Sequence, residues 1–283
     1  MKYEEPQIVA HFGLIGDVHG YLADYAMSAE VLRYSLQLGD LAFNYDGIKL
    51  DPNHHKFLPG NHDNYSVEEV TQIPEDAFLE EVTDVPEGTN LFEDGSRYTI
   101  KGDKVYRYNF NPRGRYTIIG EKVYRYTHLP PNFIGHFGTW KVPECKVEIP
   151  GRDELFFVRG AWSIDHARRT MGVDLFEREE MSQIELMQAI EAYKKAKPWL
   201  VVTHTAPLSI VGHLNLPFSG GKVYPTKTSQ ALERMLEIHQ PEYWVFGHFH
   251  QDWSKKIGNT HFVCLDELSV MAFDEAMNPY YVG

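Results

Sequence analysis

The feature that most constrains the fold is a set of short apolar segments that each end in glycine followed by a polar side chain. The first segment, 8–15, is followed by Gly16-Asp17-Val18-His19-Gly20. Segment 36–40 (L-Q-L-G-D) ends in the same way, and 57–63 (F-L-P-G-N-H-D) ends in Gly-Asn-His-Asp. Such apolar runs are typical of buried strands, and ligands of open α/β sheets bind at the edge where the strands end. The pattern therefore predicts that these polar side chains share one edge of a sheet.

The second half of the chain continues this pattern. Strands are expected at 155–160, 199–204, 243–250 and 260–265. Two of these segments lead into V-V-T-H-T-A-P and F-G-H-F-H, which supply further histidines. Apolar residues at helical spacing predict helices over 21–34 and 229–239. Ser182 and Glu185 form the capping-box pattern of a helix that runs to about Lys195.

Residues 64–130 interrupt the pattern and contain an internal repeat. The segment 97–108 (R-Y-T-I-K-G-D-K-V-Y-R-Y) recurs as 115–126, with ten of twelve positions identical. Each copy places β-branched and aromatic residues around Gly-Asp or Gly-Glu, which is the pattern of a two-residue hairpin, and 111–114 supplies a turn between the copies. We interpret 64–130 as an insertion with a duplicated β-hairpin inside a single domain of residues 1–283.

Charge limits the partners of this chain. The net charge of −13 argues against a generic nucleic-acid coat or an anionic membrane surface as partner. Segment 97–126 differs, because it holds eight basic residues against two acidic ones. Cations mixed with tyrosines suit phosphate backbones and stacked bases, so the hairpins are predicted to select a large anionic substrate. The alternative is that they pair with an acidic body or with another subunit.

The N-terminal sequence and the cysteine content both indicate a cytoplasmic protein. The first residues lack the basic and apolar regions of a signal peptide, and no apolar run reaches the length of a transmembrane helix. Cys145 and Cys264 are the only cysteines, so a disulfide framework is not indicated.

The polar side chains at the strand ends form a set of metal donors. They offer two carboxylates, one amide oxygen and four imidazoles, from Asp17, His19, Asp40, Asn61, His204, His248 and His250. Without a thiolate, such a set suits Mn²⁺, Fe or Zn²⁺ rather than a structural zinc cluster. Seven ligands exceed what one tetrahedral ion needs, and they suffice for two ions if one carboxylate is shared.

Taken in order, the five motifs G-D-V-H-G, L-G-D, G-N-H-D, V-V-T-H-T-A-P and F-G-H-F-H resemble those of the metallophosphoesterase superfamily, also called calcineurin-like phosphoesterases. The resemblance covers most of the chain outside 64–130. It implies an α/β fold in which a two-sheet β-sandwich is flanked by helices. It also implies hydrolysis of phosphate esters at a centre of two divalent metal ions.

The resemblance also implies a role for each site residue. The first ion is expected on Asp17, His19 and His250, and the second on Asn61, His204 and His248, with Asp40 between them. His62 is implied as the general acid that protonates the leaving group, and Asp63 as the residue that holds the imidazole and keeps it protonated.

The motifs depart from those of one subclass of this superfamily, the serine/threonine protein phosphatases. The segment 39–47 lacks the arginine of the G-D-Y-V-D-R-G pattern of serine/threonine protein phosphatases, and Asp63 stands where those enzymes have glutamate. Segment 159–169 (R-G-A-W-S-I-D-H-A-R-R) instead resembles single-domain bacterial and phage-encoded members, although their following Trp-Trp-Pro is replaced by L-F-E. This match assigns phosphate binding to Arg169, and a surface salt bridge is the alternative role.

Three functions are therefore considered. The first is a phosphomonoesterase that acts on phosphoproteins or nucleotides. The second is a phosphodiesterase or nuclease on the same metal centre. The third, a non-catalytic interaction module that has lost its metals, is disfavoured because no ligand position is substituted.

Overall fold

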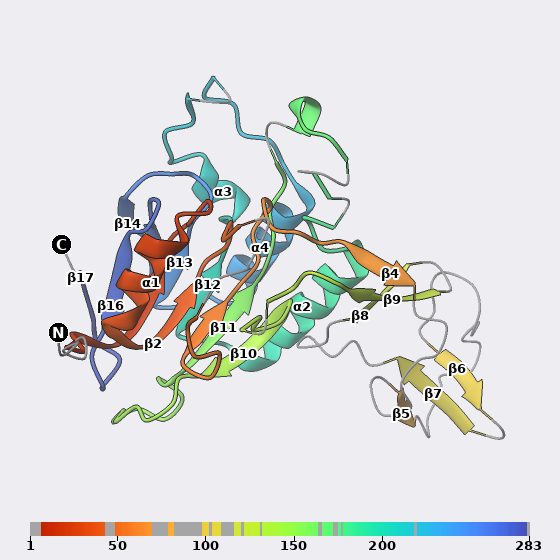
Figure 1. Ribbon diagram of the computed structural model, residues 1–283, viewed down its shortest axis with the longest axis horizontal. Helices are drawn as coiled ribbons and strands as arrows, with labels where there is room; N and C mark the ends of the chain where they lie inside the picture. The colour runs from red at the N-terminus through yellow and green to blue at the C-terminus, as the bar shows by residue number, and fades with distance from the viewer. Residues whose placement is uncertain are drawn as a thin grey trace.

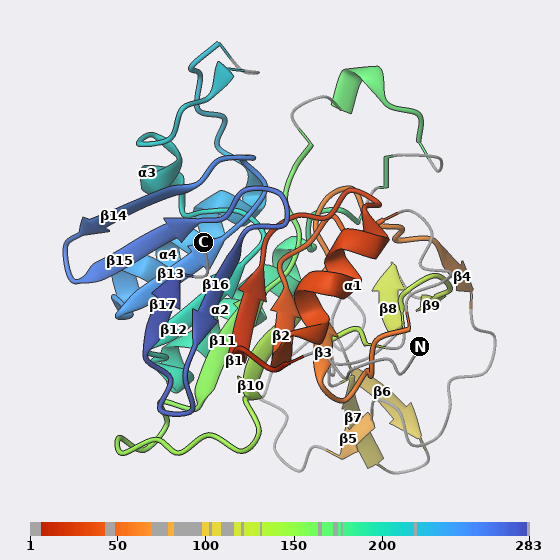
Figure 2. The same cartoon turned by 60° about the vertical axis from the view of Figure 1, so that its left-hand side comes forward.

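The computed structural model describes most of the chain (Figure 1). The described residues are 7–42, 49–69, 79–81, 98–101, 104–108, 116–119, 122–130, 132–163, 166–171, 175–176, 178–217 and 220–281. Two mixed β-sheets form the body, and helices cover them (Figure 2). The predicted α/β fold with two sheets and flanking helices is confirmed. No helix in these ranges is long and apolar enough to cross a membrane.

The first sheet has the order β17-β16-β1-β2-β3. Its strands are β1 (Ala10–Ile15), β2 (Leu32–Gln37), β3 (His55–Phe57), β16 (Val270–Phe273) and β17 (Pro279–Tyr281). The strands β1, β2 and β3 are parallel to one another; β16 pairs antiparallel with β1, and the edge strand β17 pairs antiparallel with β16. The ends of β1, β2 and β3 therefore point to one edge.

The second sheet has the order β10-β11-β12-β13-β15-β14. Its strands are β10 (Phe137–Lys141), β11 (Glu154–Val158), β12 (Leu200–Thr203), β13 (Tyr243–Phe246), β14 (Trp253–Ile257) and β15 (Thr260–Cys264). Its four central strands are parallel, and β10 and β14 close the two edges in the antiparallel direction. The ends of β12 and β13 form the counterpart of the edge in the first sheet.

Alternating side chains along each strand build the layers. Phe12 of β1 and Phe157 of β11 are fully buried between the two sheets. Phe156, one residue away, points to the other face of the second sheet, where α2 (Gln183–Ala196) and α4 (Lys227–Ile238) pack. On the outer face of the first sheet, Tyr25 of α1 (Leu22–Glu30) contributes to a third cluster. Each fully buried side chain of this size stabilises the fold by about 1.5–3 kcal/mol.

The predicted helix over 21–34 is wrong in its second half. The helix α1 ends at Glu30, and β2 begins at Leu32. Leu32, Tyr34 and Leu36 face Ala10, Phe12 and Leu14 of β1 in parallel register, so pairing with a distant strand decides their conformation. The capping box of Ser182 and Glu185 is confirmed. The helix predicted from residue 229 begins earlier, at Lys227, because Thr226 caps it together with Ser229.

The described residues of 64–130 form two small sheets of three strands each. The strand β6 (Tyr98–Lys101) pairs antiparallel with β7 (Lys104–Tyr108), and β8 (Tyr116–Ile119) pairs with β9 (Lys122–Tyr126). An acidic strand then joins each pair, β4 (Val67–Glu69) beside β9 and β5 (Leu79–Glu81) beside β7.

Both acidic strands of the insertion place glutamate opposite arginine. Glu68 stands opposite Arg125, and Glu80 stands opposite Arg107. The turns at 102–103, 111–114 and 120–121, and the side-chain faces predicted for the hairpins, lie outside the described residues.

Candidate metal centre

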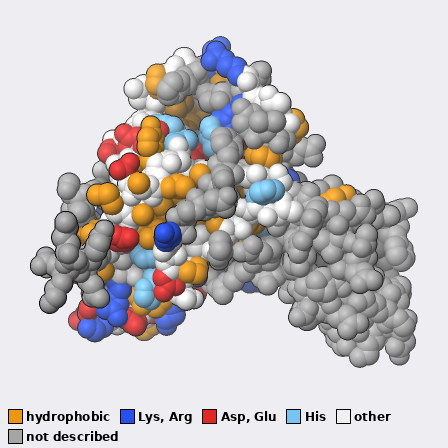
Figure 3. Space-filling model, viewed as in Figure 1, with side chains coloured by type: hydrophobic (Ala, Val, Ile, Leu, Met, Phe, Trp, Pro, Cys, Tyr) orange, Lys and Arg blue, Asp and Glu red, His pale blue; other side chains and the backbone are white. Residues whose placement is uncertain are grey.

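The predicted site residues lie together where five strands end. Asp17 and His19 follow β1, Asp40 follows β2, and Asn61 and His62 follow β3. The second sheet contributes the residue after β12 and two residues after β13, which are His204, His248 and His250. Figure 3 shows histidine side chains on the upper part of this face of the molecule. The edge predicted from the sequence is thus shared by both sheets.

Two buried carboxylates lie at the centre of the group. Asp17 and Asp40 are each 1% exposed. One oxygen of each accepts a backbone N–H, from His248 to Asp17 Oδ2 at 2.9 Å and from His62 to Asp40 Oδ1 at 2.7 Å. The other oxygens, Asp17 Oδ1 and Asp40 Oδ2, are buried without a hydrogen-bond partner. A buried charged oxygen without a partner is costly, so these atoms indicate a place for a cation.

One group of donors surrounds Asp17. His250 Nε2 lies 3.7 Å from Asp17 Oδ2 and 3.1 Å from His19 Nε2. His19 Nε2 is 3.9 Å from the same oxygen of Asp17. Burial lowers the pKa of His19, which keeps its imidazole in the neutral form that a metal ion needs. These three side chains match the set predicted for the first ion.

A second group surrounds Asp40. His204 Nε2 lies 3.4 Å from Asp40 Oδ1 and 2.9 Å from Asn61 Oδ1. The rings of His204 and His248 are 5.1 Å apart between centroids. The other oxygen of Asp40, Oδ2, lies 3.8 Å from His19 Nε2. The two oxygens of Asp40 therefore face different groups, as a shared carboxylate would.

The charges of the side chains at the centre are not balanced among themselves. Burial raises the pKa of Asp17 well above its usual range. Burial would also raise the pKa of Asp40, but the close His204 imidazole lowers it. Burial would lower the pKa of His204, yet Asp40 and Asp17 raise it to about 9. A proton on His204 thus offsets part of the buried negative charge, and a divalent cation would displace it.

The glycine before Asp40, Asn61 and His248 has a steric reason. A Cβ atom at Gly39 would collide with His204 Nδ1, and one at Gly60 would collide with Asp40 Oδ1. At Gly247, the added Cβ would meet Asp17 Oδ1. The repeated glycine of the sequence pattern therefore leaves room for ligand atoms of neighbouring strands.

The backbone at the site is strained at several ligands. His19, Asp40, His248 and His250 adopt positive φ angles of 47°, 51°, 71° and 48°. This left-handed conformation costs a non-glycine residue about 1–2 kcal/mol. Strain of this kind persists where the surrounding structure enforces it, and it clusters at functional sites. The conformation aims these side chains back toward the carboxylates.

Two ligands are oriented by hydrogen bonds to groups outside the centre. The Nδ1–H of His204 donates to the carbonyl of Leu38 at 2.8 Å, which leaves Nε2 free to face Asn61 and Asp40. The amide nitrogen of Asn61 donates to Ser163 Oγ at 3.0 Å, and Ser163 Oγ donates to Glu179 Oε2 at 2.7 Å. Such partners fix the donor atom that points to a metal ion.

Asp63 connects two of the ligand loops. Its buried carboxylate accepts backbone N–H groups of Asp40 (2.9 Å), Leu41 (3.0 Å) and Gly60 (2.7 Å). Burial and the charge of Asp40 raise the pKa of Asp63 to about 7, and these N–H groups act in the opposite direction. Asp63 thus positions the loops after β2 and β3. Its predicted action on the His62 imidazole stays a prediction.

His62 and Arg169 face each other at the rim of the centre. The side chain of His62 is 30% exposed, and its Nε2 lies 3.9 Å from Asp40 Oδ2. A guanidinium nitrogen of Arg169 contacts the same Nε2. Because a guanidinium only donates, His62 Nε2 accepts in this arrangement. The structure therefore brings the two residues implied in leaving-group and phosphate chemistry to the same place.

Glu267 belongs to the site and was missed by sequence reasoning. Its Oε1 lies 3.0 Å from His250 Nδ1 and 3.9 Å from His19 Nε2. The neighbouring Leu268 donates its backbone N–H to the carbonyl of Asp17 at 2.9 Å, which holds the loop in place. Carboxylates that accept from the second nitrogen of a histidine orient it toward a metal. No motif surrounds Glu267, so only its position reveals it.

The donor set fits divalent metal ions. It contains unpartnered buried carboxylate oxygens, imidazoles turned toward them, and two acceptors, the Leu38 carbonyl and the Glu267 carboxylate, at the Nδ1 atoms of His204 and His250. Three groups of ligand atoms meet metal-binding spacing, and they are Asp17 with His19 and His250, Asp40 with His19 and His62, and Asp40 with His204 and His248. A metal-binding site is therefore supported at this edge.

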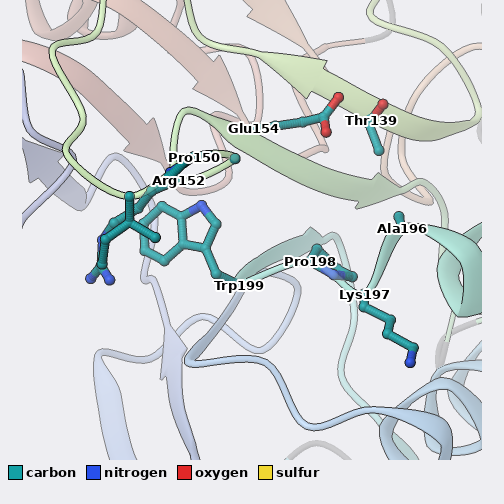
Figure 4. A pocket seen from close by; sticks show the side chains of 10 residues that line it. Thr139, Pro150, Arg152, Glu154, Ala196, Lys197, Pro198 and Trp199 are labelled. Atoms are coloured by element: carbon teal, nitrogen blue, oxygen red, sulfur yellow. The ribbon is translucent and has the colours of Figure 1, made fainter.

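A pocket of about 220 Å³ lies elsewhere, at the opposite ends of β11 and β12 (Figure 4). The guanidinium of Arg152 lies 4.6 Å from the ring centroid of Trp199, and Arg152 also pairs with Glu242 at 2.9 Å. None of the metal-donor residues lines this pocket. It is therefore separate from the metal centre.

Residues 10–252 match the family model described as calcineurin-like phosphoesterase. No curated protein matches the sequence. Among solved structures, the chain is similar to a protein assigned as a 5'-nucleotidase from Staphylococcus aureus, solved in complex with alpha-ketoglutarate, with 12% sequence identity and a TM-score of 0.37. The similarity covers 96% of this chain and 52% of that one, so this chain spans about half the length of that protein.

Replacing Asp40 by asparagine should weaken metal binding by more than about 10-fold, because it removes a charge that faces both donor groups. Calorimetric titration with Mn²⁺ and the metal content after dialysis measure the effect. Asp24→Asn, an exposed change in α1, is the matched control. Equal metal content in Asp40→Asn and the control would contradict this assignment of Asp40.

Replacing Glu267 by glutamine should weaken binding of the ion beside His250 by about 10-fold, since the orienting carboxylate charge is lost while the side-chain shape is kept. The same titration measures it, with the exposed Glu30→Gln as control. An unchanged affinity would show that Glu267 is only a neighbour of the site.

Proposed function

Because this chain belongs to the calcineurin-like phosphoesterase family and is a metal-dependent hydrolase, we propose that it is a phosphomonoesterase with two metal ions at the centre described above. The observation that supports this most is the pair of buried carboxylates with unpartnered oxygens, Asp17 and Asp40. Each of them faces its own group of imidazoles.

The proposed division of the ligands follows the two groups. Asp17, His19 and His250 hold the first ion, and Asn61, His204 and His248 hold the second. Asp40 lies between them, with Oδ2 toward His19 and Oδ1 toward His204. The oxygen and nitrogen donors favour Mn²⁺, with Fe or Zn²⁺ as alternatives. When bound, a pair of such ions polarises the phosphoryl oxygens and lowers the pKa of an attacking water.

In this proposal, Arg169 and His62 complete the reaction. The guanidinium of Arg169 binds a phosphate oxygen, for which its planar pair of donors is suited. In the ligand-free arrangement it contacts His62 Nε2. When Arg169 turns to the phosphate, Nε2 is released to hold a proton and pass it to the leaving oxygen. His62 then acts as the general acid, with Asp63 holding the loop that carries it.

The insertion is proposed to bind a large anionic substrate or another subunit through residues 97–126. A cytoplasmic location is also proposed, supported by the free thiols of Cys145 and Cys264.

The monoester assignment predicts faster turnover of p-nitrophenyl phosphate than of bis-(p-nitrophenyl) phosphate, by at least about 10-fold in kcat/KM, because the monoester offers an additional charged oxygen to Arg169 and the metal ions. Activity is measured after chelation and after return of Mn²⁺, Zn²⁺ or Fe²⁺. Faster turnover of the diester would favour a phosphodiesterase or nuclease. If neither ester is turned over in a metal-dependent way, the non-catalytic interaction module is the function that remains.

The general-acid assignment predicts a leaving-group effect. His62→Asn should slow hydrolysis of an alkyl phosphate by about 10²–10⁴-fold, since an alkoxide needs a proton to depart. The loss on p-nitrophenyl phosphate should be much smaller, because p-nitrophenolate leaves without help. His213→Asn, at an exposed histidine after α3 (Leu208–Val211), is the control. Equal losses on both esters would argue against proton donation by His62.

A further inference from the structure

Three aromatic side chains from two loops meet beside the metal centre. Trp162 follows β11, His166 lies in the 3₁₀ helix η1 (His166–Arg168), and Tyr224 lies in the loop before α4. The rings of Trp162 and His166 are nearly parallel, with 14° between their planes and 6.1 Å between centroids. The centroid of the Tyr224 ring is 6.2 Å from that of Trp162. We call these three side chains the aromatic platform.

The platform is tied to the centre at both ends of one loop. Ser163, directly after Trp162, accepts the hydrogen bond from the proposed ligand Asn61 at 3.0 Å. One peptide unit and one serine side chain thus place the Cα of Trp162 within about 10 Å of the Asn61 amide. At the other end of the loop, Arg169 contacts His62. A single small molecule can therefore reach both the platform and the groups proposed to react.

These rings are more accessible than core aromatic residues. Tyr224 is 47% exposed, His166 is exposed, and Trp162 is half-buried. In contrast, Trp244 and Phe157 of the second sheet are fully buried. The loops that hold the platform rise above the strand ends in Figures 1 and 2, on the side of the metal centre. Accessible aromatic surface next to a polar site is typical of a ligand-binding surface.

We propose that the aromatic platform binds the base of a nucleoside phosphate. This inference rests on the proposed function and specifies its substrate class. The phosphate lies at Arg169 and the metal donors, while the base stacks on Trp162 with Tyr224 beside it. Base–aromatic stacking tolerates any base, so the platform selects nucleotides as a class rather than one base.

The position of the platform favours a base over a ring bonded directly to the leaving oxygen. In an aryl phosphate the ring is bonded to the leaving oxygen itself, so it lies against His62, the proposed proton donor. The base of a nucleotide is separated from the phosphate by a ribose. That spacing matches the place of Trp162, which directly precedes Ser163 in the chain. Ser163 itself contacts the donor residue Asn61.

The test compares two substrates that differ only in the base. The Mn²⁺-loaded full chain should hydrolyse adenosine 5'-monophosphate with a kcat/KM about 10-fold or more above that for ribose 5-phosphate. Trp162→Leu should bring the ratio of the two values toward 1, and Trp162→Phe should retain most of it. Tyr280→Leu, at an exposed tyrosine of the edge strand β17, should keep the ratio of the unmodified chain.

Binding of adenosine, measured by calorimetry, gives a readout that needs no turnover. The unmodified chain and Trp162→Phe should bind it, and Trp162→Leu should bind it about 10-fold more weakly. The platform proposal is overturned if kcat/KM is equal for the two phosphates, or if the Trp162 variants bind adenosine as tightly as the unmodified chain. Either result leaves the phosphoesterase proposal intact. Trp162-dependent binding of adenosine without hydrolysis of any ester would instead overturn the proposed function and support the platform.

Discussion

The structure depends on a pair of buried negative charges at the junction of two sheets. Asp17 and Asp40 lie where water is almost excluded, and an oxygen of each has no hydrogen-bond partner. Without compensation, such burial would cost several kcal/mol. The imidazoles around both carboxylates offset part of this negative charge, and the two carboxylates raise the pKa of His204. In the metal-bound state, divalent cations offset the charge more fully.

This requirement explains features that are unfavourable when considered alone. Four of the predicted ligands adopt left-handed backbone conformations, and glycines occupy positions where any Cβ would overlap an atom of a predicted ligand. Two packed sheets make such conformations tolerable, because Phe12, Phe157 and their neighbours fix the strand ends from which the loops leave. The core thus holds the strand ends in place, and the loops that follow them carry the side chains of the site.

The groups around the centre divide by position. Ser163, Glu179 and Glu267 orient ligands from outside, Arg169 and His62 stand at the open rim, and the aromatic platform extends from the same loop. Segments far apart in the sequence therefore serve one site. The strands within 67–126 are different in kind, because they pair with one another and not with the two main sheets.

The sequence by itself predicted the donor set, because pairs of glycine and a polar residue after apolar strands can be read residue by residue. It also determined the α/β class and the capping box of α2. Only the tertiary structure decided the end of α1, where Leu32 pairs with Ala10 instead of continuing a helix. It also revealed Glu267, the tie from Asn61 to Glu179, and the meeting of Trp162 with Tyr224. Such residues have no local signature, because their roles arise from contacts between segments that the chain brings together only on folding.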